Sequence, residues 1–165
     1  VGTMRYRTGT EYVEVDGVDL VPSVATIVNA GGGTITQISG NAYSSTSDGT
    51  SGSGIRPKFD FATTAGATYK LLITPTGAIT GTVNFDFYDG ASYLFQNYDF
   101  TTDKDIYFTD NGTVFAAFDG VNTYSIAGFT ISIIEVTAED ASYADMCMQT
   151  GASTYEWVNI VRNTY

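Results

Sequence analysis

Turn signals recur every 8–15 residues along this chain, and apolar and polar residues alternate between them. Phe59 and Phe61 flank Asp60, and Tyr69 and Leu71 flank Lys70. Because successive side chains on a β-strand point to opposite faces, this period of two predicts half-buried strands. Many short strands separated by Asp-Gly and Asn-Gly turns predict a β-sandwich or barrel. A solenoid would need a constant spacing between turns, which is absent, so the predicted fold class is an all-β sandwich.

The two ends of the chain carry related segments. Thr8-Gly9 stands before the aromatic segment 12–15, and Thr150-Gly151 stands before a second aromatic segment, 155–158. Each end therefore predicts a β-hairpin with its Thr-Gly dipeptide at the tip. Two related hairpins around one domain suggest a module of a longer, extended protein, and the start at Val1 suggests a fragment or a processed chain. The predicted division is an N-terminal hairpin over 1–22, a sandwich over 23–137 and a C-terminal hairpin over 138–165.

Three stretches between the turns have distinct compositions. Residues 39–54 are nearly all Gly, Ser, Thr and Asn, which predicts a loop or a weak strand inside one. Residues 124–136 form the longest apolar run and predict a strand. Residues 138–144 are the only segment that could hold a short helical turn.

Charge and composition exclude several classes of function. The 165 residues include 18 acidic and 7 basic side chains, for a net charge of −11. Nucleic-acid binding needs a basic surface, and so does electrostatic attachment to anionic membranes. The acidic net charge therefore excludes both of these functions. The chain has no run of 18 or more apolar residues, so no membrane insertion is expected.

The chain contains no histidine and a single cysteine, Cys147. The chain therefore cannot form a catalytic triad that depends on His, and it cannot form a zinc site built from His and Cys. Cys147 lies in an alternating strand pattern and is expected to be a buried thiol. A glycosidase using two carboxylates such as Asp86 and Asp89 is the enzymatic alternative, but the prediction is a protein without catalytic residues.

Acidic residues are concentrated between positions 86 and 119. Oxygen ligands in loops suit Ca²⁺, and Asp103 and Asp105 alternate as a pair of ligands would. The sequence matches no EF-hand loop, so a solvated acidic surface is the favoured interpretation and no cofactor is expected, with Ca²⁺ as the alternative.

Aromatic and polar residues share one predicted strand face. Alternation puts Phe85 and Phe87 on one side of their strand and polar residues and a tyrosine on the other. Sugars stack on aromatic faces and hydrogen-bond to carboxylates and amides, so an outward face of this kind suits a glycan. The alternative is that these tyrosines cover the sheet or pack against a neighbouring subunit. The candidate glycan face consists of Asn84, Asp86, Tyr88, Tyr93, Tyr98 and Tyr107.

Two family resemblances follow from these motifs. Residues 59–63, with Gly66 and residues 69–71, resemble a strand–turn–strand of carbohydrate-binding-module-like jelly rolls, and residues 128–133 resemble their closing strand. The segment 2–17 is similar to hairpins of bacteriophage tail and head fibres, and residues 146–158 resemble the same device. The resemblance implies a jelly-roll β-sandwich and a virion fibre, spike or capsid-appendage subunit; it carries no catalytic residues.

The implied partners are further copies of the chain, with a homotrimer favoured, other virion proteins and a host-surface glycan. Isolated hairpins are marginal in water and must bury an apolar face on something, which supports oligomerisation independently. The candidate oligomer contacts are Tyr6, Tyr12, Val13, Tyr155, Trp157, Val158 and Ile160. The expected location is the virion surface. A non-catalytic carbohydrate-binding module of a secreted bacterial enzyme or adhesin is the alternative.

Overall fold

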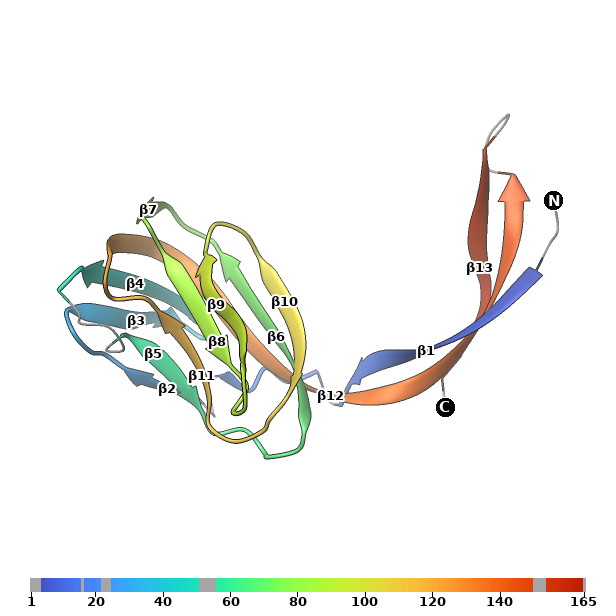
Figure 1. Cartoon of the computed structure of the whole chain (residues 1–165), viewed down its shortest axis with the longest axis horizontal. Coiled ribbons are helices and arrows are strands. Elements are labelled where there is room, and N and C mark those ends of the chain that lie inside the picture. Colours follow the sequence, from blue (N-terminus) through green and yellow to red (C-terminus); the bar gives the residue numbers. More distant parts are fainter. Residues whose placement is uncertain (1–3, 16, 22–24, 51–55, 150–153, 165) are drawn as a thin grey trace. The chain divides into compact units, whose positions relative to one another are not determined.

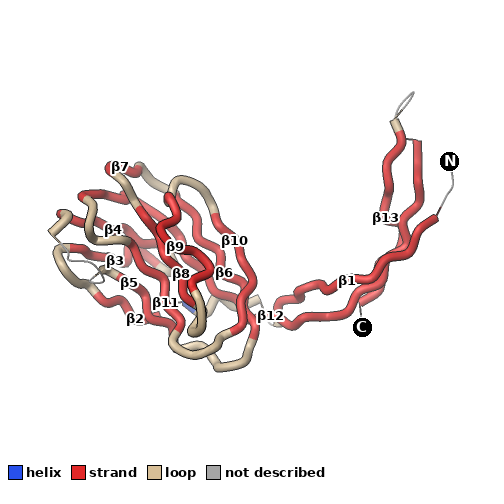
Figure 2. Tube along the Cα trace, in the orientation of Figure 1, coloured by secondary structure: helices blue, strands red, loops and turns tan. Residues whose placement is uncertain are grey.

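A computed structural model of the chain describes residues 4–15, 17–21, 25–50, 56–149 and 154–164. Strands dominate these residues and are joined by loops and turns (Figure 2), and the all-β prediction is confirmed. The described chain divides into two compact units, a sandwich unit (Val15–Glu135) and a strand unit (Val1–Glu14 with Val136–Tyr165). In the described parts of the chain, no helix has the length and hydropathy that crossing a membrane requires.

Thirteen strands are described, labelled in Figure 1. They are β1 (Met4–Glu14), β2 (Ala25–Val28), β3 (Gly33–Ser39), β4 (Ala42–Asp48), β5 (Lys58–Phe61), β6 (Thr68–Pro75), β7 (Ile79–Gly81), β8 (Asn84–Tyr88), β9 (Tyr93–Asp99), β10 (Lys104–Thr109), β11 (Val114–Phe118), β12 (Thr123–Gln149) and β13 (Tyr155–Thr164).

The strands form two antiparallel sheets. The first has the order β10-β6-β12-β4-β3, and β1, β13 and β7 also pair with β12. The second has the order β2-β5-β11-β8-β9. Most consecutive strands from β4 to β12 alternate between the two sheets, so residues close in sequence contribute to opposite layers.

Aromatic side chains from both sheets fill the space between the layers. Phe129 of the first sheet is fully buried, and its ring centroid lies 5.1 Å from that of Phe118 and 6.2 Å from that of Phe59 in the second sheet. Tyr43 meets Phe59 edge-on at 4.9 Å. Such offset and edge-on pairs stabilise beyond the area they bury, by about 0.5–1.5 kcal/mol each. This core contains Phe59, Leu71 and Phe85, with the alternate apolar residues of the same strands. The alternation of apolar and polar residues predicts this for the segments 59–61, 69–73 and 85–87.

The polar stretch 39–54 contains a strand in the interior of a sheet. β4 lies between β3 and β12, with Tyr43, Ser45 and Ser47 buried in alternation. The Ser45 hydroxyl donates to the Thr34 carbonyl oxygen at 2.9 Å and lies 3.1 Å from the Tyr124 hydroxyl. Burial raises the pKa of Tyr124 to about 12, although the Ser45 contact opposes that rise. Because the hydroxyls find partners, a Ser-rich strand can be buried without losing hydrogen bonds.

The predicted N-terminal hairpin is wrong. β1 runs without a turn through Thr8 and Gly9, which pair with Ser142 and Ala141 of β12. The segment 138–144 is likewise strand and not a helical turn. Since β12 offers a long antiparallel partner, every residue of β1 from Met4 to Glu14 finds a register there, and the Thr-Gly dipeptide is held extended.

At the C-terminal end, β12 and β13 pair antiparallel from Gln149↔Tyr155 onward. The Thr150-Gly151 tip expected for this hairpin lies outside the described residues. A register shift between Ala144 and Asp145 marks a bulge in the pairing.

We expect Phe129→Ala to lower the free energy of unfolding by about 3–5 kcal/mol, because it removes the ring that joins Tyr43, Phe59 and Phe118 and leaves a cavity. Urea denaturation followed by circular dichroism measures this. The control Val121→Ala, at a side chain that is 50% exposed, should stay within about 0.5 kcal/mol of the parent. Equal losses for the two variants would contradict a core centred on Phe129.

Candidate functional site

Three aromatic rings form a cluster on the outer face of the second sheet. Tyr88 stacks on Phe115 of the neighbouring strand, with ring centroids 5.3 Å apart, and Tyr93 approaches Tyr88 to 5.1 Å. The register places Tyr88 opposite both Phe115 and Tyr93. Tyr93 is 42% exposed, so the cluster presents an aromatic surface to solvent.

Charged residues flank this cluster on β5. The Lys58 ammonium lies 5.5 Å from the centroid of the Phe115 ring and 2.7 Å from a carboxylate oxygen of Asp60. A cation over a ring is favourable because the ring face is electron-rich. The patch therefore combines aromatic faces with a paired donor and acceptor, which is a surface suited to binding; it contains no nucleophile with an adjacent base.

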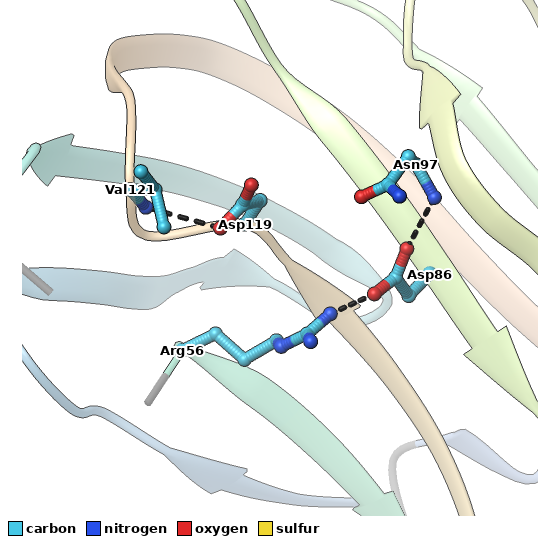
Figure 3. A network of polar contacts seen from close by, with 5 residues as sticks. All are labelled: Arg56, Asp86, Asn97, Asp119 and Val121. Atoms are coloured by element: carbon cyan, nitrogen blue, oxygen red, sulfur yellow. Dashed lines mark hydrogen bonds and ion pairs between the residues drawn. The ribbon is translucent and has the colours of Figure 1, made fainter. Parts of the chain in front are cut away.

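An ion pair with a buried carboxylate lies beside the patch and is drawn in Figure 3. Arg56, just before β5, reaches across β11 and forms an ion pair with Asp86 of β8, whose side chain is 2% exposed. The other Asp86 oxygen accepts a hydrogen bond from the backbone N–H of Asn97 at 2.6 Å. Asn97 has a φ of +53°, at an irregularity of the β8–β9 pairing that turns its N–H towards Asp86. Every oxygen of Asp86 thus has a partner within the protein.

The structure separates the six residues predicted as a glycan face. Asn84, Asp86 and Tyr88 alternate outward along β8 as expected, and Tyr93 joins Tyr88. Asp86 is buried in its ion pair and is not available to a ligand in this arrangement.

The other two tyrosines lie elsewhere. Tyr98 packs against the core at the edge of the second sheet, where its hydroxyl lies 2.8 Å from that of Thr102 and the Lys104 ammonium lies 4.3 Å from its ring centroid. The Thr102 contact, with a smaller contribution from Lys104, lowers the pKa of Tyr98. Tyr107 belongs to β10 in the first sheet, opposite Lys70.

Sequence reasoning missed Phe115, Lys58 and Arg56 as parts of this surface. The segment Val-Phe-Ala-Ala-Phe of β11 does not show which phenylalanine faces the core. The register decides it, because Phe115 pairs with Tyr88 and Phe118 with buried Phe85.

The candidate calcium ligands do not converge. Asp105 is 53% exposed and pairs with Lys70 at 3.0 Å, and Asp103 is exposed in the loop before β10. Within the described ranges, no group of three or more Asp, Glu or Cys side chains could hold a metal ion.

Several acidic residues expected on a solvated surface are buried hydrogen-bond acceptors in turns. The Asp89 carboxylate accepts from the backbone N–H groups of Ala91 and Ser92 at 2.8 and 2.7 Å. Asp110 accepts from the Gly112 N–H and the Thr63 hydroxyl, both at 2.8 Å. These acids hold the chain reversals, as Asp side chains do in Asx-turns.

The Asp89 and Asp110 turns touch one another. The Asn111 N–H donates to the Asp89 carbonyl oxygen at 2.8 Å. A Cβ on Gly90, whose φ is +100°, would lie 2.2 Å from the backbone nitrogen of Gly112. Glycine is therefore required there both by conformation and by the closeness of the second backbone.

The predicted oligomer contacts lie in the strand unit, on two faces. Tyr12 pairs with Ala138 and Val158 with Met146, which sets them on one face of the sheet. Val13, Trp157 and Tyr155 alternate with these residues and belong to the opposite face. Tyr6 pairs with Ala144 in the backbone register and Ile160 belongs to β13, but their side chains lie outside the described part. Cys147, opposite Trp157, is half-buried instead of buried.

Comparisons with protein-family models, curated proteins and solved structures find no match to this chain.

Asp89 should make stability dependent on pH. Burial raises the pKa of Asp89, but the hydrogen bonds from Ser92, Ala91 and Asn111 outweigh burial and bring that pKa below its ordinary value of 3.8. Since ionisation is favoured in the folded state, the stabilisation is complete above the unfolded pKa and is lost as pH falls through the folded pKa.

We expect Asp89→Asn to cost about 1–3 kcal/mol at pH 7, because charge-assisted hydrogen bonds become neutral ones. The difference from the parent should shrink as pH falls below 3.8. Urea denaturation between pH 2 and 7 measures it, with Val121→Ala as a control that changes no titrating group. A constant difference across that range would contradict the role of the Asp89 carboxylate.

Proposed function

We propose that this chain is a structural subunit of a virion fibre, spike or capsid appendage, which assembles as a homo-oligomer through the strand unit and displays the sandwich unit for attachment to a host surface. The observation that carries the proposal is the architecture of the strand unit. Its three strands, β1-β12-β13, form a single layer. Domains bury apolar side chains between at least two packed layers, so this layer needs a partner.

Exposed apolar side chains support the same conclusion. Among the side chains that the structure describes, twelve large hydrophobic ones are exposed, and five of these belong to the strand unit: Tyr12, Val13, Met148, Tyr155 and Trp157. That share is high for a unit with few described side chains, and grouped exposed apolar residues mark interaction surfaces.

The strand order supports a jelly roll for the sandwich unit. β4, β12, β6 and β10 are neighbours in one sheet, and β5, β11, β8 and β9 are neighbours in the other. These eight strands, four in each sheet, agree with a jelly roll, an architecture used by capsid and lectin domains. β3 and β2 extend the two sheets at one edge, and β7 pairs with β12.

The assembly is tested by multi-angle light scattering on the purified chain at about 10 µM. We expect a mass three times that of one chain, because the resemblance to phage fibres implies a trimer and soluble homo-oligomers generally close symmetrically. A single monomeric species at this concentration would contradict the proposal.

The second candidate function is a carbohydrate-binding module, whether as the attachment surface of the virion protein or as part of a secreted enzyme or adhesin. The aromatic cluster Tyr88–Tyr93–Phe115 beside Lys58 and Asp60 favours it. Here the stacking surface and the hydrogen-bonding groups lie on one sheet face.

Glycan-array binding tests this candidate. Tyr93→Ala should lower the affinity for a bound glycan about tenfold, which corresponds to the loss of one aromatic contact. Tyr107→Ala is the matched control, because Tyr107 is 38% exposed but lies in the other sheet. Equal losses for both variants, or no bound glycan, would count against this surface.

A further inference from the structure

Four residues form a row across the outer face of the second sheet. Asp60 of β5 pairs with Phe115 of β11, which pairs in turn with Tyr88 of β8. Tyr88 pairs with Tyr93 of β9. Directly paired residues of neighbouring antiparallel strands lie on the same face of a sheet. Three spacings between strands, of about 4.8 Å each, give this row a backbone length of roughly 14 Å.

The aromatic end of the row depends on a bulge in β9. Tyr93 and Phe95 are two positions apart, which in a regular strand puts both side chains on one face. Phe95 is opposite Phe87, whereas Tyr93 is already opposite Tyr88. One extra residue of β9 therefore lies between these two pairs, as in a β-bulge. Phe95 packs against the core as a result, and Tyr93 lies outside beside Tyr88.

Tyr93 has the most accessible of the three rings. It is 42% exposed, whereas Tyr88 and Phe115 are half-buried. The planes of the Tyr88 and Phe115 rings differ by only 26°. The Tyr93 ring lies at 57° to Tyr88 and at 81° to Phe115, so neither neighbour stacks face to face on it. This ring is therefore the one on which the apolar face of a sugar can stack.

The other end of the row carries a hydrogen-bond donor and an acceptor side by side. The Lys58 ammonium and an Asp60 carboxylate oxygen are 2.7 Å apart, and their side chains are 32% and 34% exposed. The ammonium has further N–H groups and the carboxylate has further acceptor positions beyond this contact. Two hydroxyl groups on adjacent carbons of a sugar can accept from Lys58 and donate to Asp60, in charge-assisted hydrogen bonds.

We propose that this row, together with Lys58, binds a neutral oligosaccharide lying across the strands, with one sugar on Tyr93 and a later sugar at the Lys58–Asp60 pair. This inference rests on the second candidate function, the carbohydrate-binding module, and names its ligand class. A six-membered sugar ring is about as wide as an aromatic ring, so one sugar cannot reach from Tyr93 to Asp60. The ligand is therefore a chain of at least two or three sugars.

The charges around the row favour a neutral ligand. Arg56, beside the row, is paired with Asp86, and Lys58 is paired with Asp60. The sandwich unit contains 12 acidic and 4 basic residues, a net charge of −8. An acidic sugar would have to displace one of the paired carboxylates, and the rest of the unit would repel it.

Titration calorimetry on the full chain tests the length and the charge of the ligand. The probes are neutral oligosaccharides of galactose, glucose, mannose or N-acetylglucosamine with one to four sugars, and oligogalacturonides of the same lengths. We expect the bound neutral series to gain at least about tenfold in affinity between one and three sugars and little beyond three. Oligogalacturonides should bind at least about tenfold more weakly than that series, because each of their sugars carries a carboxylate.

Two variants separate the ends of the row. Lys58→Gln should lower the affinity for the three-sugar probe about tenfold and leave the affinity for the single sugar near the parent value. Tyr93→Ala should lower both affinities. The matched control is Lys70→Gln, because the Lys70 ammonium lies 3.0 Å from an Asp105 carboxylate oxygen and 5.8 Å from the centroid of the Tyr107 ring. The same combination of groups thus occurs in the first sheet, away from the row.

The outcomes distinguish this inference from the function on which it rests. Binding that depends on Tyr93 but falls equally in Lys58→Gln and Lys70→Gln would overturn the proposed ligand while leaving the second candidate function standing. An affinity that is independent of chain length, or a preference for oligogalacturonides, would do the same. No binding of any probe would overturn both.

Light scattering and circular dichroism on the Tyr93→Ala variant complete the test. We expect a folded chain with the same oligomer mass as the parent, since the row is assigned to a ligand and not to another copy. A folded variant with a lower mass would show that copies of the chain pack on this row, and it would overturn the row as a sugar-binding surface.

Discussion

The contact between the two aromatic layers is the interaction on which the sandwich unit depends. Phe129 and Tyr43 from one sheet meet Phe59 and Phe118 from the other at centroid distances of 4.9 to 6.2 Å. Neither sheet could bury these rings alone, so the layers are stable only together. Once this core is in place, the alternate side chains of β8 and β11 must face outward, and the surface cluster of Tyr88 and Phe115 follows from the same pleat.

Several acidic residues stabilise this fold through hydrogen bonds and an ion pair instead of forming a solvated surface. Asp89 and Asp110 accept backbone N–H groups at two neighbouring turns, and Asp86 neutralises Arg56 across β11. In the described residues, no buried side-chain nitrogen or oxygen lacks a partner. Much of the negative charge near the turns is therefore held in fixed hydrogen bonds, and the surface left for a ligand is aromatic with a neutral Lys58–Asp60 pair.

The strand unit differs from the sandwich unit, because its described strands form one sheet and its described residues include no second layer to cover the apolar side chains. β12 belongs to both units. Its first part pairs with β4 in the sandwich unit, and its last part pairs with β1 and β13 in the strand unit. Assembly with other copies is the arrangement that would give this layer the burial that the sandwich unit achieves by itself.

The sequence by itself determined the all-β class, the turns at Asp89-Gly90 and Asn111-Gly112, and the core faces at Phe59 and Phe85, because local alternation and turn chemistry carry that information. It could not show that Thr8-Gly9 is extended, that the Ser-rich β4 is interior, or that Tyr107 and Tyr88 lie in different sheets. Those features depend on pairing between residues far apart in sequence: β1 with β12, Ser45 with Tyr124, and β10 with β6. Only the tertiary structure decides them, because a strand's partner supplies the hydrogen bonds and burial that override weak local preferences.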